Sequence, residues 1–484
     1  MHPFLAPLPV CSPAVQWANA VARPVVWNGR RRAGFHRPHG ATRTDHQGGF
    51  FVDRNLPRRE RLLTSARPLP DFDVVSASGP WLRLADGRRI FDGSSGLICV
   101  NVGQGSPAVF SRIEQQFRRS SFGGAAVVQP RLQLELMERL CQAVGRPADS
   151  VALVTCGTLG VEVAIGLARN IVRARGGKRR ADILTSTLSY HGMSAFTLAL
   201  AGNGARRPRA EDAFGLGPAF PAPYPPTHGH TQGSCDASCA DEVAKAIDSR
   251  GAENVAAILL EPVNGTTGGA FVPPDGYLRR VSQICRERNV LVIHDEVLTG
   301  LWRTGTPLAS HHWDGADPDL CILSKGLGAG YTAVGAVLVA PELASLLRLQ
   351  DGGSLPALGT MATHPLQAAA CLGVLDDLEA MDVDAFRARG QQLGAGLRSL
   401  TGQPGIRDVR GLGHLYAVEL EPGLLWPLME QAERNGVFFY PFTGAGQPTS
   451  EGLVVAPPLT STADDISHLT TALSDAVTGL ARLG

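Results

Sequence analysis

The chain lacks the features that would place it in a membrane, on a nucleic acid or outside the cell. No run approaches eighteen consecutive apolar residues without a charge, so no segment is long enough to cross a bilayer as a helix. The first thirty residues lack the basic start, apolar middle and small-residue cleavage site of a secretory signal. Lys and Arg total 45 against 44 Asp and Glu, so no net charge favours nucleic acid or anionic lipid. We therefore expect a cytoplasmic protein that binds neither nucleic acid nor a membrane.

A disulfide framework is also lacking. The nine cysteines are an odd number scattered from Cys11 to Cys371, often inside apolar segments, which is typical of reduced and buried thiols. One polar cluster has the residue types of a zinc site: His228, His230, Cys235 and Cys239. Its Cys-x3-Cys and His-x-His spacings match none of the common zinc patterns. We interpret it as a polar loop with incidental thiols and expect no metal.

The 484 residues are long enough for two or three domains. Residues 1–66 are rich in Arg, Pro, Gly and His without a sustained period, which indicates a flexible extension or an overlong gene start. From Trp81 the pattern changes, because Trp81–Leu84, the Asp86-Gly87 turn and Arg89–Asp92 predict a hairpin. An ordered domain begins near this hairpin.

The middle of the chain alternates short apolar runs with longer helical patterns, which predicts a mainly parallel sheet with helices on both faces. The candidate strands are Val151–Thr155, Ala181–Thr185, Val255–Leu260, Val290–Ile293, Leu320–Leu323 and Val334–Val339. Several are apolar throughout, as in strands buried on both faces. A loop at 359–366, helices at 367–381 and 384–400, and strands at 413–421 and 453–455 then predict a smaller α+β domain.

Two of these strands end in residues that together indicate one chemistry. Asp295 and Glu296 follow one apolar strand and Lys325 follows the next, at the edge where ligands bind in open α/β sheets. In pyridoxal 5′-phosphate (PLP) catalysis a lysine forms a Schiff base with the cofactor, and a carboxylate keeps the pyridine nitrogen protonated. Taken singly, such residues are more often caps or surface charges. Together they predict that Lys325 and Asp295 fill these two roles.

A cofactor phosphate needs backbone donors, and the start of a helix can provide them. Cys156, Gly157 and Thr158 lie between a strand and a helix expected to run from Leu159 to about Arg173. A simple turn and cap is the alternative interpretation of this segment. Tyr190 follows another strand and could stack on the pyridine ring, or could be only a buried aromatic anchor.

At this point the chain resembles the class III (ornithine or ω-amino acid) aminotransferase family over roughly residues 75–475. The resemblance is carried by many short motifs in the order and spacing of the family: Asp86-Gly87-Arg88, Ser95-Gly96, Cys156-Gly157-Thr158, Tyr190-His191-Gly192, Glu261-Pro262-Val263, Asp295-Glu296-Val297, Arg303-Thr304-Gly305, Lys325-Gly326-Leu327, Thr360, His364-Pro365, Val409-Arg410-Gly411 and Pro457-Pro458-Leu459.

The resemblance implies the PLP-dependent transferase fold type I. It divides the chain into a large PLP-binding domain at 116–365 and a small domain made from 67–115 and 366–484. It also implies site roles, in which Gly157 and Thr158 hold the phosphate, Tyr190 and His191 lie at the ring, and Val297 packs on the opposite ring face. Glu261 would lie near the substrate, and Thr360 would reach the phosphate of the neighbouring subunit in a homodimer.

Four departures from the family pattern concern the cofactor and the substrate. Cys156-Gly157-Thr158-Leu159-Gly160 replaces Ser-Gly-Ser/Thr-Glu-Ala, so a hydroxyl and a carboxylate near the phosphate are missing. Leu301-Trp302-Arg303 replaces an aromatic-Gly-Arg segment, and 103–107 replaces a turn that bears a histidine. Residues 442–451 contain no arginine to pair with a substrate carboxylate. We infer that one substrate is an amine, an aldehyde or a larger unusual molecule rather than a simple α-amino acid.

The sequence thus predicts a PLP-dependent aminotransferase that moves an amino group between an amine or amino acid donor and a carbonyl acceptor, in two half-reactions through Lys325. Another PLP reaction on the same scaffold (aminomutase, decarboxylase or racemase) stays open, since the groups around the cofactor choose which bond breaks. A non-catalytic relative is the third interpretation, because of the altered phosphate loop.

Overall fold

The computed structural model describes residues 72–122, 131–146, 151–177, 180–202, 217–220, 235–350, 359–362, 364–443 and 450–481, all within one unit that begins at Phe72. The expected extension at 1–66 lies outside the described residues, as do His228 and His230. Within the described ranges, no helix has the length and apolar character needed to cross a membrane.

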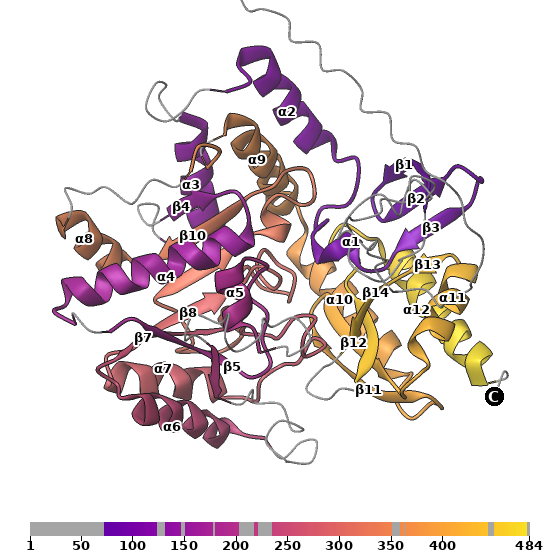
Figure 1. Ribbon diagram of the computed structural model, residues 1–484. Helices are drawn as coiled ribbons and strands as arrows, with labels where there is room; N and C mark the ends of the chain where they lie inside the picture. The colour runs from indigo at the N-terminus through magenta and orange to yellow at the C-terminus, as the bar shows by residue number, and fades with distance from the viewer. Residues whose placement is uncertain are drawn as a thin grey trace, which may run out of the picture. The chain divides into compact units, whose positions relative to one another are not determined.

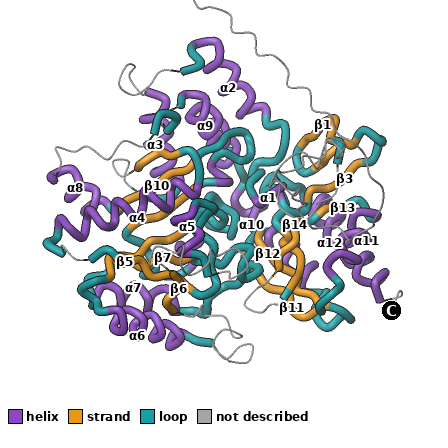
Figure 2. Tube along the Cα trace, viewed as in Figure 1, coloured by secondary structure: helices purple, strands orange, loops and turns teal. Residues whose placement is uncertain are grey.

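A seven-stranded sheet lies in the left part of this unit as drawn in Figures 1 and 2. Its strands, in spatial order, are β4 (Val151–Val154), β10 (Gly335–Val339), β9 (Leu320–Leu323), β8 (Leu291–Asp295), β7 (Val255–Leu260), β5 (Asp182–Ser186) and β6 (Gly217–Phe220). Every strand expected in this part of the sequence is present within one or two residues, and β6 was not foreseen. The mainly parallel sheet is confirmed, since β6, β5, β7, β8 and β9 pair in parallel.

Strand β10 departs from the parallel pattern, because it runs antiparallel to both β4 and β9. The connection from β9 to β10 spans only Ser324–Val334 and holds one short turn of 3-10 helix, Lys325–Leu327. A parallel return needs a crossover of about a dozen residues or more, usually with a helix. This connection is too short, so β10 returns antiparallel.

Helices cover both faces of the sheet. Side chains of α4 (Gly157–Ala174) and α8 (Pro341–Gln350) form one core with alternate residues such as Ile293 and Ile322. On the opposite face, α3 (Arg131–Ala143) and α9 (Pro365–Glu379) pack on β4, β9 and β10, while α6 (Asp241–Arg250) and α7 (Tyr277–Glu287) pack on β5, β7 and β8. Burial on both sides explains why these strands are apolar throughout.

Two four-stranded sheets lie beside the large one, at the right of Figure 1. The first contains β1 (Val74–Ser78), β2 (Trp81–Leu84), β3 (Arg89–Asp92) and β13 (Val437–Phe438), so the expected hairpin is confirmed and a late strand joins it in parallel. The second contains β11 (Ile406–Leu412), β12 (Leu415–Leu420), β15 (Glu451–Val455) and β14 (Tyr440–Thr443). One face of the second sheet packs on α10 (Val383–Arg398), α11 (Leu425–Arg434) and α12 (Ala463–Ala481), and the other meets Ile98, Val263 and Ala270.

Three helices are not part of the layers described above. They are α1 (Ser95–Ile98), α2 (Pro107–Arg119) and α5 (Ala195–Leu200), with 3-10 turns at Ala237–Ala240 and Ala309–His312. Ser106 caps α2 by accepting from the Val109 amide at 3.2 Å. The loop expected at 359–366 ends slightly early, because Pro365 is the first residue of α9, a position that suits a proline without an N–H.

Candidate active site

The loops that follow the parallel strands gather around one cavity of about 280 Å³. Strands β5, β7, β8 and β9 run in the same direction, so their carboxyl ends lie at the same edge of the sheet. The cavity is lined by Leu97, Ile98, Cys156, Gly157, Thr158, Tyr190, His191, Gly192, Glu261, Thr266, Asp295, Val297, Leu298, Ser324, Lys325 and Tyr440.

Asp295 is the last residue of β8 and is held from two sides. Its Oδ2 lies 2.8 Å from Nδ1 of His191, and its Oδ1 accepts from the Val297 amide at 3.1 Å. A carboxylate can only accept, so Nδ1 of His191 carries the hydrogen. His191 is 2 % exposed, and its Nε2 has no hydrogen-bond partner among the described residues. The pair therefore presents a fixed carboxylate and an unused imidazole nitrogen at the cavity.

Lys325 begins the 3-10 turn after β9, with a backbone φ of 27° in the left-handed region. Ser324, immediately before it, is fixed by a hydrogen bond from Oγ to the Val334 carbonyl at 2.6 Å. Burial lowers the pKa of the Lys325 amine, and the negative charge of Asp295 opposes this shift. A lowered pKa increases the fraction of neutral amine, the form that attacks a carbonyl carbon.

Glu261 follows β7 and faces the same cavity. Its Oε2 accepts from Asn264 Nδ2 at 2.7 Å, and its Oε1 accepts from the Gly265 amide at 3.3 Å. Burial raises the pKa of Glu261 to about 7, although the nearby charge of His191 opposes the shift. A carboxyl group with this pKa exchanges a proton readily near neutral pH.

The amino end of α4 closes another side of the cavity. Cys156 is the N-cap in an extended conformation, and its side chain makes no capping hydrogen bond. The first amides of a helix have no partner within it, so Gly157 and Thr158 can offer N–H groups to an anion. A Cβ atom on Gly157 would lie 3.0 Å from both methyl carbons of Val297, so glycine allows this close approach.

The structure brings the residues predicted from sequence together with one exception. Lys325, Asp295, Glu261, Gly157, Thr158, Tyr190, His191 and Val297 all line the cavity. Thr360 is exposed in the segment 359–362 and does not line it. A site shared with a neighbouring subunit remains the prediction for Thr360.

Several lining residues were missed by the sequence analysis: Leu97, Ile98, Thr266, Leu298, Ser324 and Tyr440. Thr266 lies five residues after Glu261, so its closeness to the motif Glu261-Pro262-Val263 could have identified it as a lining residue. Tyr440 enters from β14 of another sheet, and no local pattern marks it. Cys235 and Cys239 form no disulfide, and within the described part of the chain no group of three His, Cys, Asp or Glu could hold a metal.

Comparison with known families and sequences gives a consistent result. The family model described as aminotransferase class-III matches residues 64–477. An uncharacterized aminotransferase, YodT, of Bacillus subtilis (strain 168) is 30% identical over 432 residues, which cover 86% of this chain and 96% of that protein. An omega-aminotransferase of Caulobacter vibrioides is 30% identical over 386 residues, covering 77% and 83%.

Solved structures agree with the sequence relatives. A thermostable (S)-enantioselective omega-transaminase from Thermomicrobium roseum matches with a TM-score of 0.76 and 29% identity, over 86% of this chain and 96% of that chain. An amine transaminase from an uncultivated Pseudomonas species, described in its PLP-bound form, matches with a TM-score of 0.77 and 27% identity, over 93% and 99%.

Proposed function

The chain belongs to the class III aminotransferases, PLP-dependent enzymes of fold type I that move an amino group from an amine or amino acid to a carbonyl acceptor, and we propose that its active site is the cavity around Lys325. The observation that carries this proposal is the convergence of an amine of lowered pKa, a fixed carboxylate and a helix amino end on one cavity.

The residues at the cavity fit PLP. Amides at the start of α4 suit the phosphate, Asp295 suits the protonated ring nitrogen, and Lys325 suits the aldehyde. Gly192 adds to the fit, because a Cβ there would lie 2.7 Å from Thr158 Oγ1 and crowd the cradle. The unpartnered Nε2 of buried His191 is a further polar atom that a bound molecule or water can use.

Bound PLP supplies an aldehyde that condenses with amines and a ring that accepts the electron pair released at the substrate carbon. Lys325 would hold the cofactor through its aldehyde. Once free, the Lys325 amine would be placed to accept a proton from the substrate carbon and to return it. Its lowered pKa allows it to act as a base near neutral pH.

Asp295 would pair with a protonated ring nitrogen, which would let the ring accept negative charge. His191 and the Val297 amide fix the orientation of the Asp295 carboxylate through their two hydrogen bonds. Tyr190 and Val297, which both line the cavity, would enclose the two ring faces. Glu261 would hold or release a proton beside the substrate.

We also propose that the substrate side of the cavity suits an amine, an aldehyde or a larger molecule without a carboxylate at the position where many relatives bind one. The walls contributed by Leu97, Ile98 and Leu298 are apolar, and Thr266 and Tyr440 are neutral. The segment 442–451 contains no arginine, so a two-pronged carboxylate pair cannot form there.

A homodimer is the proposed assembly. Phe110 and Phe117 lie seven residues apart on α2 and are 56% and 60% exposed, and Phe122, shortly after this helix, is 43% exposed. Such a group of exposed aromatic side chains is typical of a protein interface. In this assembly Thr360 would reach the phosphate in the neighbouring subunit.

The division into a large domain (116–365) and a small domain (67–115 and 366–484) is also kept as a proposal. The parallel pairing of β13 with β3 supports it, since it joins the N-terminal and C-terminal parts of the small domain. A cytoplasmic location likewise remains a prediction from sequence.

Two measurements test the assignment. Borohydride treatment of cofactor-saturated protein, followed by peptide mapping, should place a phosphopyridoxyl mass on Lys325. In a separate sample without borohydride, mixing the cofactor-saturated protein with an amine and then with pyruvate should convert the cofactor absorbance from the aldehyde form to the amine form and back. A mass on another lysine would refute the site, and no absorbance change with any amine donor would favour another PLP reaction.

A further inference from the structure

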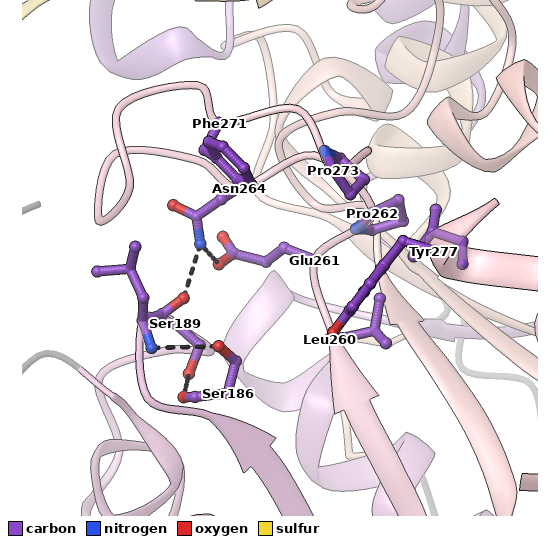
Figure 3. Close-up of a pocket in the computed structure, with 11 residues that line it drawn as sticks. Ser186, Ser189, Leu260, Glu261, Pro262, Asn264, Phe271, Pro273 and Tyr277 are labelled. Atoms are coloured by element: carbon purple, nitrogen blue, oxygen red, sulfur yellow. Dashed lines mark hydrogen bonds between the residues drawn. The ribbon is translucent and has the colours of Figure 1, made fainter. Parts of the chain in front are cut away.

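Asn264 bridges two of the loops that form the active site (Figure 3). Its side-chain Nδ2 donates to Glu261 Oε2 at 2.7 Å and to the Leu188 carbonyl at 2.8 Å. Its Oδ1 accepts a hydrogen bond from the Gly268 amide. Asn264 is 8% exposed, so these bonds are shielded from water. One amide thus connects the loop after β7 to the segment 188–192 that carries Tyr190 and His191.

The orientation of this amide is fixed by backbone groups. The Leu188 carbonyl can only accept, and the Gly268 amide can only donate. Nδ2 must therefore face Leu188 and Oδ1 must face Gly268. As a consequence, the atom next to Glu261 is an N–H donor that cannot rotate to present an oxygen.

This donor acts on the protonation of Glu261. A hydrogen bond to a carboxylate favours its ionised form and so lowers its pKa. The charged or titratable groups that act on Glu261 from the neighbouring loops are His191, Asp295 and Lys325. Burial still prevails and raises the pKa of Glu261 to about 7, so a small change in its donors moves its titration across neutral pH.

A second, smaller cavity of about 30 Å³ lies behind Glu261 and Asn264, lined also by Ser186, Ser189 and Phe271 (Figure 3). It has room for one or two water molecules. Glu261 lines both this cavity and the cofactor cavity, and therefore forms part of the wall between them. Without the bond to Asn264, only the longer bond from the Gly265 amide, at 3.3 Å, would hold the carboxyl group between the two cavities.

We propose that Asn264 is a positioning residue of the aminotransferase, and that its amide holds the carboxyl group of Glu261 at the cofactor cavity in register with the Tyr190–His191 segment. The inference rests on the proposed function, because it assumes that Glu261 exchanges a proton during the reaction. It assigns a role to a residue that does not line the cofactor cavity and that acts only through Glu261 and Leu188.

The test uses the full-length holoenzyme with two substitutions, Asn264→Leu and Asn264→Asp. The leucine removes both donated bonds at similar volume, and the aspartate places a second carboxylate against Glu261. The control is Asn435→Leu, because the Asn435 amide also donates to a backbone carbonyl, that of Ala472 at 2.9 Å, but between α11 and α12 of the small domain. Each variant is assayed for bound PLP, for the pH dependence of the cofactor absorbance and for the rate of its conversion by an amine.

Both Asn264 variants should retain PLP on Lys325. The limb of the pH–rate profile that reports Glu261 should move to higher pH by about one unit in Asn264→Leu and further in Asn264→Asp. The direction is upward whichever form of Glu261 is active, because both changes disfavour the carboxylate. In a Glu261→Gln background that limb is missing, and Asn264→Leu should then cause no shift.

Three results would overturn the inference: unchanged profiles in both Asn264 variants, a shift that persists with Glu261→Gln, or loss of the fold in both variants, which would make the amide purely structural. A parent protein that carries no cofactor on Lys325, or does not react with any amine, would instead refute the proposed function. The two failures are therefore distinguishable.

Discussion

The cofactor cavity and the cluster around Arg303 are both buried and polar, but their polar atoms face different surroundings. Arg303 is fully buried, and its two terminal nitrogens donate to the Pro457 carbonyl at 2.7 Å, to Asn101 Oδ1 at 2.7 Å, and to the His414 carbonyl and Ser95 Oγ at 3.3 Å each. In the cavity, Lys325, Asp295 and His191 face open space of about 280 Å³. The first cluster joins distant segments of the chain, and the second is left available to a ligand.

The same contrast separates two neighbouring carboxylates. Glu296 follows Asp295 directly, yet it is 1% exposed and accepts from the Ala309 amide at 2.6 Å, the Ser310 amide at 3.0 Å and Thr299 Oγ1 at 3.0 Å. It does not line the cavity. A position after a strand therefore does not by itself make a carboxylate functional. What distinguishes the two carboxylates is whether the side chain faces the cavity or is enclosed by protein donors.

The largest expected effect comes from removing the central group of the cavity. Lys325→Ala should lower the rate of amino transfer by about a thousandfold or more, because it removes the amine proposed to attach the cofactor and to carry the proton. Thermal unfolding of the cofactor-free protein should change little, since burial disfavours the charged amine. Single-turnover absorbance with an amine donor checks the rate. Reaction at the parent rate would contradict the comparison.

Substitution of Arg303 should have the opposite effect, a loss of stability of the fold. Arg303→Met leaves the Pro457 carbonyl and Asn101 without their donor, and it should lower the free energy of unfolding by about 1–3 kcal/mol for each acceptor left unpaired. Burial lowers the pKa of this guanidinium to about 10, so it remains charged at neutral pH. Chemical denaturation of cofactor-free protein measures the loss. Arg118→Met is the control, because its ion pair with Glu114 is exposed and should matter by less than about 1 kcal/mol.

Asp295→Asn tests whether the cavity carboxylate acts by charge rather than by packing. The amide keeps the volume but lacks the charge proposed to hold a proton on the ring nitrogen, so amino transfer should fall by about a hundredfold. The matched change is Glu296→Gln, which lies one residue away and outside the cavity. It should destabilise the fold while the rate per folded molecule is retained. Equal losses of rate in both variants would remove the distinction between the two carboxylates.

These contrasts also show what the sequence could predict. Lys325 and Asp295 were predictable because fully apolar strands mark the sheet, and the carboxyl ends of parallel strands meet at one edge. Loops that converge from different sheets leave no such pattern. Tyr440, from β14, and Asn264, behind Glu261, could be placed only by tertiary structure.

Trp302 is a further residue whose surroundings could not be predicted from the local sequence. The departure at Leu301-Trp302-Arg303 left the substrate shape open in the sequence, and Trp302 does not line the cavity. Its ring packs edge-on against Phe386 of α10 at 5.9 Å, and both Leu301 and Trp302 have positive φ values, 55° and 70°. Positive φ is where a glycine is preferred, so the departure concerns backbone conformation and packing in this subunit. Local sequence could not reveal which way the side chain points.

The smallest expected effect comes from adding one polar atom to the cavity. Cys156 is exposed at the start of α4, where the thiol is a weak donor and makes no capping bond. Cys156→Ser supplies a hydroxyl that can donate to the cofactor phosphate beside the free amides of the helix, and it should tighten PLP binding about threefold to tenfold. Titration of cofactor-free protein with PLP measures the affinity. Cys235→Ser, outside the cavity lining, should leave it unchanged. If the serine at 156 did not tighten binding, the amides alone would satisfy the phosphate, and the missing hydroxyl would have no consequence for the cofactor.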